Sequence, residues 1–261
     1  MNESTRDSAD YVAEAVDRGV NYFDVAPSYG NAEEMLGPAL KPYRQKVFLA
    51  CKTQKRDAAS ARASLEESLQ KLRTDRFDLF QLHAVTTDED VETILGPGGT
   101  LEAFVKAKEE GLVRYLGFSA HSEKAALALL DAFRFDSILF PVSWASWLGA
   151  GFGPAVLTAA QKKGVPVMAL KALARRALAK DEPRTREKAW YVPVDTYDEA
   201  SLGLRFTLSR PGVVAALSPG HADLFRWACD AADKLAPLSV AEEAALTERA
   251  KTLTPVFPQK D

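Results

Sequence analysis

With 261 residues, of which 47% are hydrophobic and 26% charged, the chain has a globular composition with enough apolar side chains for a sizeable core. The formal net charge is -3 and the basic residues are spread along the chain, which argues against nucleic acid or an anionic membrane as a partner. The polar N-terminus, the lack of a long apolar run, and two cysteines that fit neither a metal site nor a disulfide framework predict a soluble cytoplasmic protein with free thiols.

Short apolar runs alternate with longer amphipathic stretches, which is typical of βα units repeated around a parallel sheet. Most of the apolar runs are nearly continuous, as expected when helices cover one face of the sheet and a barrel interior covers the other. A single α/β barrel needs about 250 residues, so one domain over residues 1–261 is expected. The seven predicted strands are residues 21–26, 46–52, 77–83, 113–119, 136–144, 165–171 and 212–218.

Helices are predicted between these strands. Residues 59–73 carry leucines at steps of four and three, which gives one apolar stripe. Glycines that follow helical runs and precede strands indicate left-handed helix ends. They are Gly19, Gly111 and Gly164. Ser239 followed by Glu242 predicts a capping box that opens a helix running to about residue 253, outside the regular repeat.

Two long loops follow strands, at residues 84–99 and 174–196. In a parallel barrel the loops after strands form the functional face, so these loops either shape a substrate cleft or are surface insertions. Residues 1–10 do not supply the strand that would precede the first helix. We therefore expect a barrel without its usual N-terminal first strand, through truncation or through another mode of closure.

Four polar residues lie at or just after the ends of apolar strands: Asp24, Tyr29, Lys52 and His83. Each has an ordinary explanation when taken singly: a helix cap, a packed ring, a lysine that reaches solvent, or a hydrogen-bonded core histidine. Because the carboxyl ends of neighbouring parallel strands meet at one edge, their joint occurrence favours a shared catalytic site.

The run DVAPSYGNAEEMLG at residues 24–37 resembles the Asp-x-Ala-x-x-Tyr-Gly signature of aldo-keto reductases, and Lys52 and His83 fall where that family has its lysine and histidine. The resemblance extends from about Thr5 to the C-terminus. It implies a (β/α)8 TIM barrel that transfers hydride between NAD(P)H and a small-molecule carbonyl or alcohol. It implies Tyr29 as the general acid, Lys52 as the cation that stabilises its phenolate, Asp24 as the partner of Lys52, and His83 as the ligand of the carbonyl oxygen.

The resemblance also implies a nicotinamide site, in which Ser119 matches the family directly. His121 stands near the family's asparagine and is either a carboxamide donor or a helix cap. Leu139 and Leu170 replace a glutamine and a stacking tyrosine, which removes an amide contact and an aromatic face. Lys171, at the end of a strand, is a further candidate either for this site or for a Schiff base.

The run SPGHADLF after the last strand resembles the family's phosphate-binding loop, where backbone N–H groups at a helix start meet the cofactor pyrophosphate. Ser218 and Gly220 belong to that loop, and His221 and Arg226 are the nearby cationic candidates. NADP is the expected cofactor, with NAD as the alternative.

Three function classes follow: a reductase, a cofactor-sensing or regulatory barrel without efficient turnover, and a lysine-dependent aldolase that uses Lys52 or Lys171. The altered nicotinamide contacts support the second, whereas a Schiff-base enzyme does not require Tyr29 with His83. We favour the reductase. Aromatic residues expected in the loops after two strands would hold a ring-bearing substrate or simply pack. They are Trp144, Trp147, Trp190 and Tyr191.

Overall fold

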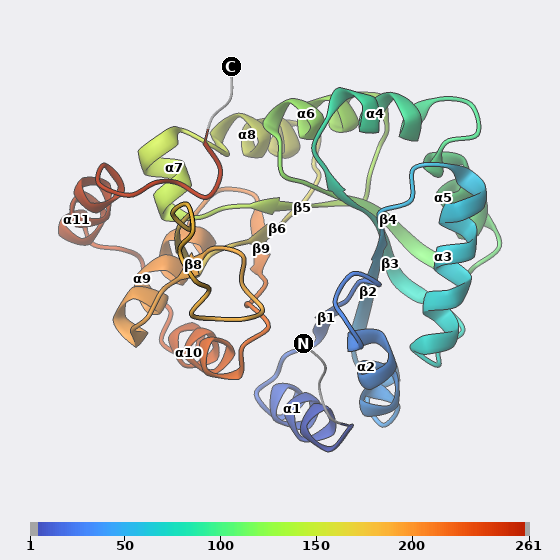
Figure 1. Ribbon diagram of the computed structural model, residues 1–261, viewed down its shortest axis with the longest axis horizontal. Coiled ribbons are helices and arrows are strands. Elements are labelled where there is room, and N and C mark those ends of the chain that lie inside the picture. The colour runs from blue at the N-terminus through green and yellow to red at the C-terminus, as the bar shows by residue number, and fades with distance from the viewer. Residues whose placement is uncertain (1–4, 259–261) are drawn as a thin grey trace. The chain divides into compact units, whose positions relative to one another are not determined.

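A computed structural model describes residues 5–258 of the chain. These residues form two compact units, one ending at Ser137 and the other starting at Ile138. Each unit repeats strand and helix around parallel strands (Figure 1). The prediction of one domain over residues 1–261 stays a prediction.

The first unit contains four parallel strands in the order β1-β2-β3-β4. Within the described residues its first element is a helix, as the sequence predicts. The register places Lys52 of β2 level with Gln81 of β3, and Gln81 level with Gly117 of β4. The elements of this unit are α1 (Thr5–Asp17), β1 (Tyr22–Asp24), α2 (Ala32–Leu40), η1 (Arg44–Lys46), β2 (Phe48–Thr53), α3 (Ala58–Lys71), β3 (Phe77–Val85), α4 (Asp88–Leu95), α5 (Thr100–Glu109), β4 (Val113–Ala120) and α6 (Glu123–Ala132).

Aromatic and aliphatic side chains fill the space between these strands and their helices. Phe80 of β3 lies 4.9 Å, centroid to centroid, from Phe104 of α5, and α3 and α5 run side by side in Figure 1. The predicted leucine stripe of α3 is buried. Gly37 of α2 lies so close to Leu72 that a Cβ would come within 2.7 Å of its backbone, so only glycine fits there.

The second unit holds three parallel strands in the order β5-β6-β9 and a separate antiparallel pair, β7-β8. Helix α11 packs on α7, as Figure 1 also shows, around a core that includes Trp144, Phe206 and Leu246. The elements are β5 (Ser137–Pro141), α7 (Trp144–Ala150), α8 (Pro154–Lys162), β6 (Val167–Leu170), β7 (Ala174–Arg176), β8 (Val192–Pro193), α9 (Tyr197–Leu208), β9 (Val213–Ala216), α10 (Ala222–Ala232) and α11 (Val240–Ala250).

All seven predicted strands are confirmed, with small shifts at their ends. The three helix-ending glycines have positive φ angles of 83°, 77° and 66°, and the predicted capping box opens α11.

One predicted strand was too long. Residues 136–144 were expected to be extended, but Ser143 caps a helix that begins at Trp144, because its side chain accepts a hydrogen bond from the Ser146 N–H. Trp144 and Trp147 therefore lie in α7 rather than in a loop.

Both predicted long loops contain regular structure. Residues 84–99 include α4, whose acidic first turn follows the cap Thr87. Residues 174–196 include the short pair β7-β8, which is too brief to show an apolar period. Trp190 and Tyr191 do lie between these two short strands.

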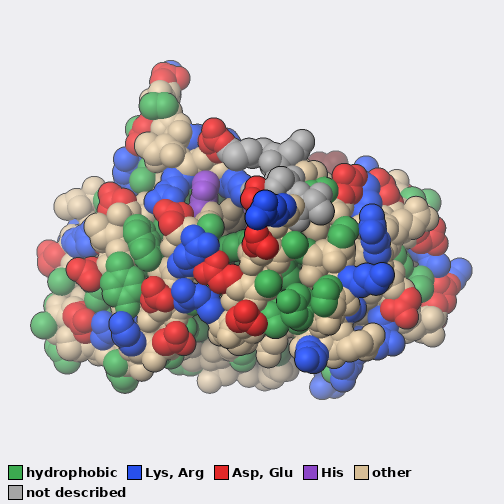
Figure 2. All heavy atoms as spheres, turned by 90° about the horizontal axis from the view of Figure 1, so that it is seen from below, with side chains coloured by type: hydrophobic (Ala, Val, Ile, Leu, Met, Phe, Trp, Pro, Cys, Tyr) green, Lys and Arg blue, Asp and Glu red, His purple; other side chains and the backbone are tan. Residues whose placement is uncertain are grey.

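The surface carries both signs of charge. Figure 2 shows acidic and basic side chains interspersed over one face. Among the helices of residues 5–258, none combines the length and apolar character needed to cross a membrane.

Candidate active site

The first unit brings four predicted site residues together at the carboxyl ends of its strands. Asp24 ends β1, Lys52 lies near the end of β2, and His83 lies near the end of β3. Tyr29 follows β1 in the loop before α2. Because these strands are parallel and adjacent, their carboxyl ends share one edge of the sheet.

A buried ion pair forms the centre of this group. The Lys52 ammonium donates a hydrogen bond to Oδ2 of Asp24, and both side chains are largely removed from solvent. Burial by itself would lower the pKa of Lys52, but the charge of Asp24 and contacts with Tyr29 outweigh it, so the pKa of Lys52 is raised. Lys52 therefore carries its proton throughout the neutral range.

Gln81 completes the ion pair, although the sequence analysis did not select it. Its Nε2 donates to the other carboxylate oxygen of Asp24, Oδ1, at 3.1 Å. Gln81 is fully buried on β3, level with Lys52 on the neighbouring strand. A polar residue inside the apolar run DLFQLH was the sequence signal for it.

Tyr29 lies between Lys52 and His83. The Lys52 ammonium is 5.0 Å from the centre of the Tyr29 ring, and the His83 ring meets it edge-on with centroids 5.6 Å apart. The Tyr29 side chain as a whole is 44% exposed. Burial of the phenol raises its pKa, the charge and hydrogen bond of Lys52 act to lower it, and Asp24 raises it again. The net pKa is raised, so Tyr29 holds its proton at neutral pH.

Ser119 and His121 flank this group on β4 and just after it. The buried Ser119 hydroxyl oxygen accepts a hydrogen bond of 2.8 Å from the N–H of Ala84, the residue after His83. The backbone N–H of His121 donates to the carbonyl of Val85. Ser122, not His121, caps α6.

The other predicted cofactor residues belong to the second unit. Lys171 follows β6 with φ at 67°, and its ammonium lies 5.2 Å and 4.7 Å from the ring centres of Trp190 and Tyr191. Burial raises the pKa of Tyr191. Lys171 thus has an aromatic setting that the sequence did not indicate.

Ser218, Gly220 and Arg226 surround the start of α10 and are exposed. His221 stands at the cap position without a side-chain hydrogen bond to the helix, but the carboxylate of Asp223, which pairs with Arg186, accepts from the backbone N–H groups of Asp223 and Leu224. Burial lowers the pKa of His221, and so do the positive charges of Arg186 and Lys188. The start of α10 therefore already holds a carboxylate of the chain itself, which would compete with an anionic ligand there.

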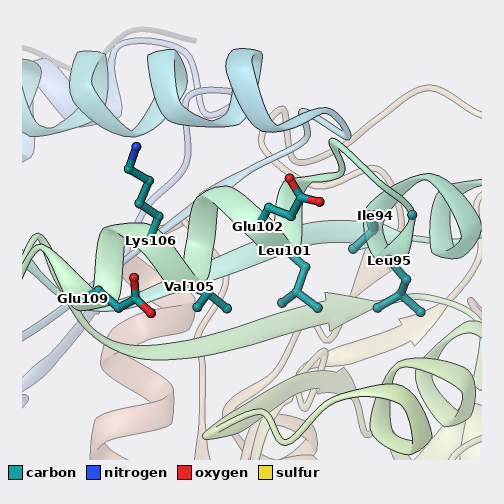
Figure 3. A pocket seen from close by; sticks show the side chains of 8 residues that line it. Ile94, Leu95, Leu101, Glu102, Val105, Lys106 and Glu109 are labelled. Carbon is teal, nitrogen blue, oxygen red and sulfur yellow. The ribbon is translucent and has the colours of Figure 1, made fainter.

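A separate surface cavity of about 500 Å³ lies between α4 and α5 (Figure 3). Leu95, Leu101 and Val105 line it, together with the charged Glu102 and Lys106. It contains none of the predicted site residues, so we assign no catalytic role to it.

A family model described as "Aldo/keto reductase family" matches residues 2–216. Among curated proteins, the chain is similar to "Uncharacterized oxidoreductase YqkF" of Bacillus subtilis (strain 168), with 34% identity over 121 residues, which are 41% of this chain and 38% of the relative. It is also similar to "Aldo-keto reductase YhdN" of the same organism, with 33% identity over 49% of this chain and 40% of that relative. The matched stretches thus span less than half of these relatives' lengths.

Solved structures match over nearly the whole chain. The holo form of aldo-keto reductase AKR11C1 from Bacillus halodurans has 24% identity and a TM-score of 0.73, covering 99% of this chain and 92% of that one. An aldo-keto reductase from Klebsiella pneumoniae in complex with NADPH has 25% identity and a TM-score of 0.70, covering 98% and 87%. These likenesses confirm the predicted α/β fold class, a (β/α)8 barrel of parallel strands.

Proposed function

Because the chain belongs to the aldo/keto reductase family, we propose that it is an NAD(P)H-dependent oxidoreductase that interconverts a carbonyl and an alcohol by hydride transfer, with Tyr29 as the general acid and base. The observation that carries this proposal is the buried Asp24–Lys52 ion pair beside the Tyr29 phenol. A protonated phenol next to a fixed cation is suited to give a proton to a developing alkoxide.

Each residue has a defined task in this chemistry. Tyr29 holds the proton that the carbonyl oxygen receives. Lys52 stabilises the phenolate left behind, since its charge acts to lower the phenol pKa. Asp24 keeps Lys52 protonated despite burial, and Gln81 fixes the second oxygen of that carboxylate.

His83 would orient the carbonyl oxygen. Its ring lies edge-on to Tyr29, so an oxygen bound to the imidazole would be near the phenol hydroxyl. A hydrogen-bond donor aimed at the oxygen also stabilises the negative charge that develops there.

Ser119 suits the nicotinamide end of a dinucleotide, although Leu139 and Leu170 lack the amide and the aromatic face that the family resemblance implies for it. When bound, NADPH or NADH supplies the hydride. Ser119 would hold the nicotinamide end, because its oxygen accepts from Ala84 and its own proton is left to donate. Ser218, Gly220 and Arg226 stay predictions as cofactor-binding residues. The NADPH bound to the Klebsiella pneumoniae relative supports NADP as the cofactor of this chain.

The alternative of a Schiff base at Lys52 fits the electrostatics poorly. A lysine nucleophile needs a neutral amine and therefore a lowered pKa. The pKa of Lys52 is raised by Asp24, so its amine is protonated at neutral pH.

A two-stage experiment tests the proposal. The folded protein is titrated with NADPH and with NADH while tryptophan fluorescence is followed, and the tighter cofactor is then used with a panel of aldehydes and ketones. We expect saturable binding, with NADPH the tighter, and oxidation of the cofactor that depends on the carbonyl. Absence of saturable binding by either nucleotide would overturn the proposal, and binding without turnover would favour a cofactor-sensing protein.

A further inference from the structure

The residue after His83 has a strained backbone. Ala84 has φ at 53°, in the left-handed region that side chains other than glycine rarely adopt. Such a conformation persists only where surrounding contacts impose it. Ala84 lies within β3, where the register with β4 shifts between Leu82 and Val85, so whatever holds Ala84 also fixes the backbone from which the imidazole projects.

Two side chains hold the backbone around Ala84. The Ala84 N–H donates to Ser119 Oγ at 2.8 Å. The Arg56 guanidinium donates through Nη2 to the carbonyl of His83 at 2.9 Å and lies 3.4 Å from the carbonyl of Ala84. Both peptide groups around Ala84 are therefore tied to side chains from other elements.

Arg56 is itself fixed in place. Its Nε donates to Asp90 Oδ1 at 2.7 Å, and Asp90 Oδ2 accepts from the N–H of Thr86 at 3.1 Å. The carbonyl of Arg56 accepts from the N–H of Thr100. Arg56 follows Lys52 by four residues, in the loop between β2 and α3, so its side chain links the end of the strand that carries Lys52 to the strand that carries His83.

We propose that Arg56 is a positioning residue that fixes the irregular backbone of β3 after His83 and thereby holds the imidazole against Tyr29. Its expected effect on turnover rests on the proposed function, whereas its effect on His83 does not. Arginine is required because its planar guanidinium bonds a carboxylate through Nε and a carbonyl through Nη2 at the same time. The single ammonium of a lysine cannot reproduce that geometry.

The chain offers a matched control in Arg44. Arg44 donates to Asp78 at 3.0 Å and to the carbonyls of Arg76 and Val47 at 2.9 Å and 3.3 Å. The exposed fractions of the two pairs are alike, 18% and 15% for Arg44–Asp78 against 19% and 22% for Arg56–Asp90. Asp78 lies near the start of β3, five residues before His83, which is roughly 16 Å along the strand.

The experiment compares Arg56→Lys with Arg44→Lys. The ring resonances of His83 are followed by NMR in the free protein. The chain has three histidines, so the spectrum is simple, and the signal that disappears in His83→Gln identifies His83. We expect the His83 resonance, which senses the Tyr29 ring current, to shift in Arg56→Lys and to stay in place in Arg44→Lys. We also expect kcat to fall about tenfold or more in Arg56→Lys alone, because small misplacements of catalytic groups are costly.

Several outcomes would overturn the inference. The first is a His83 resonance that does not move in Arg56→Lys, and the second is an equal shift in Arg56→Lys and Arg44→Lys. The third, which applies if the wild type is active, is an unchanged kcat in Arg56→Lys. If the wild type reduces no carbonyl but His83 moves only in Arg56→Lys, the positioning role stands and only the proposed function fails.

A second variant covers the case in which Arg56→Lys does not fold. Asp90→Asn keeps Arg56 in place but weakens the bond that orients its guanidinium. We expect a smaller shift of the His83 resonance and a smaller loss of kcat in the same direction. An Asp90→Asn protein with the wild-type resonance and kcat would overturn the inference.

Discussion

Replacing Tyr29 with phenylalanine removes the proposed proton donor and keeps the ring. The edge-on contact with His83 should survive the substitution because it does not use the hydroxyl, and the ion pair with Asp24 should keep the Lys52 ammonium in place. General acid catalysis contributes about 10²–10⁴-fold, which corresponds to roughly 2.7–5.5 kcal/mol of barrier. Carbonyl reduction should therefore fall at least a hundredfold.

The cost of Tyr29→Phe in stability should be small. The change deletes a hydrogen bond between Lys52 and a side chain that is 44% exposed. A bond to a charged group contributes about 1.5–3 kcal/mol when well protected, so about 1 kcal/mol is expected at this exposure. That corresponds to a fall of about 2–4 °C in Tm for a chain of this size. The nucleotide titration should be nearly unchanged.

The assay is single-turnover reduction with the best carbonyl substrate, using protiated and deuterated cofactor so that an isotope effect identifies chemistry as the slow step. Tyr115→Phe is the control. That ring stacks on Phe48 with centroids 6.1 Å apart, at the start of β4 rather than at its carboxyl end. A Tyr29→Phe enzyme that reacts at the wild-type rate while showing the isotope effect would refute the role given to Tyr29.

Three further predictions concern buried and capping groups. Gln81→Leu should lower the free energy of unfolding by about 1–3 kcal/mol, because it leaves a buried oxygen of Asp24 without its donor; an unchanged denaturant midpoint would contradict this. Glu242→Gln should lower Tm at pH 7, because Arg205 and the Ser239 cap depress the pKa of Glu242 to about 2 in the folded state. The difference in Tm from the wild type should shrink as the pH falls from about 4.3, where the unfolded carboxylate takes up its proton, toward 2. Tyr22→Phe should be neutral or stabilising at pH 7, because the buried Tyr22 hydroxyl has no hydrogen-bond partner among residues 5–258. Above about pH 10 the variant should lose less stability than the wild type, because burial raises the phenol pKa of Tyr22 and only the unfolded wild type then releases its proton. Parallel pH profiles of the two proteins would argue against this.

The sequence by itself determined the strands and the family. Continuous apolar runs identified all seven parallel strands, because both faces of such strands are buried and solvent imposes no alternation. The motif at residues 24–37 pointed to the family that the comparisons show. Local patterns of this kind are readable because a strand, a cap or a glycine helix end depends mainly on its own few residues, as at Ser239 and Gly111.

Short elements followed a different rule. The acidic turn that opens α4, the start of α7 at Trp144 and the pair β7-β8 are too brief to set a period, so neighbouring segments decide their conformation. Ser143 illustrates this, since it lies within an apolar run and yet caps a helix.

Only the tertiary structure decided which polar groups support the candidate site. Gln81 meets Asp24 across 57 residues of chain, and Arg56 meets the carbonyl of His83 across 27. Neither spacing is encoded in a local pattern, because contacts of this range arise only when separate strands are brought into register. The sequence therefore indicated the groups proposed to do the chemistry, and the fold selected the groups that hold them in place.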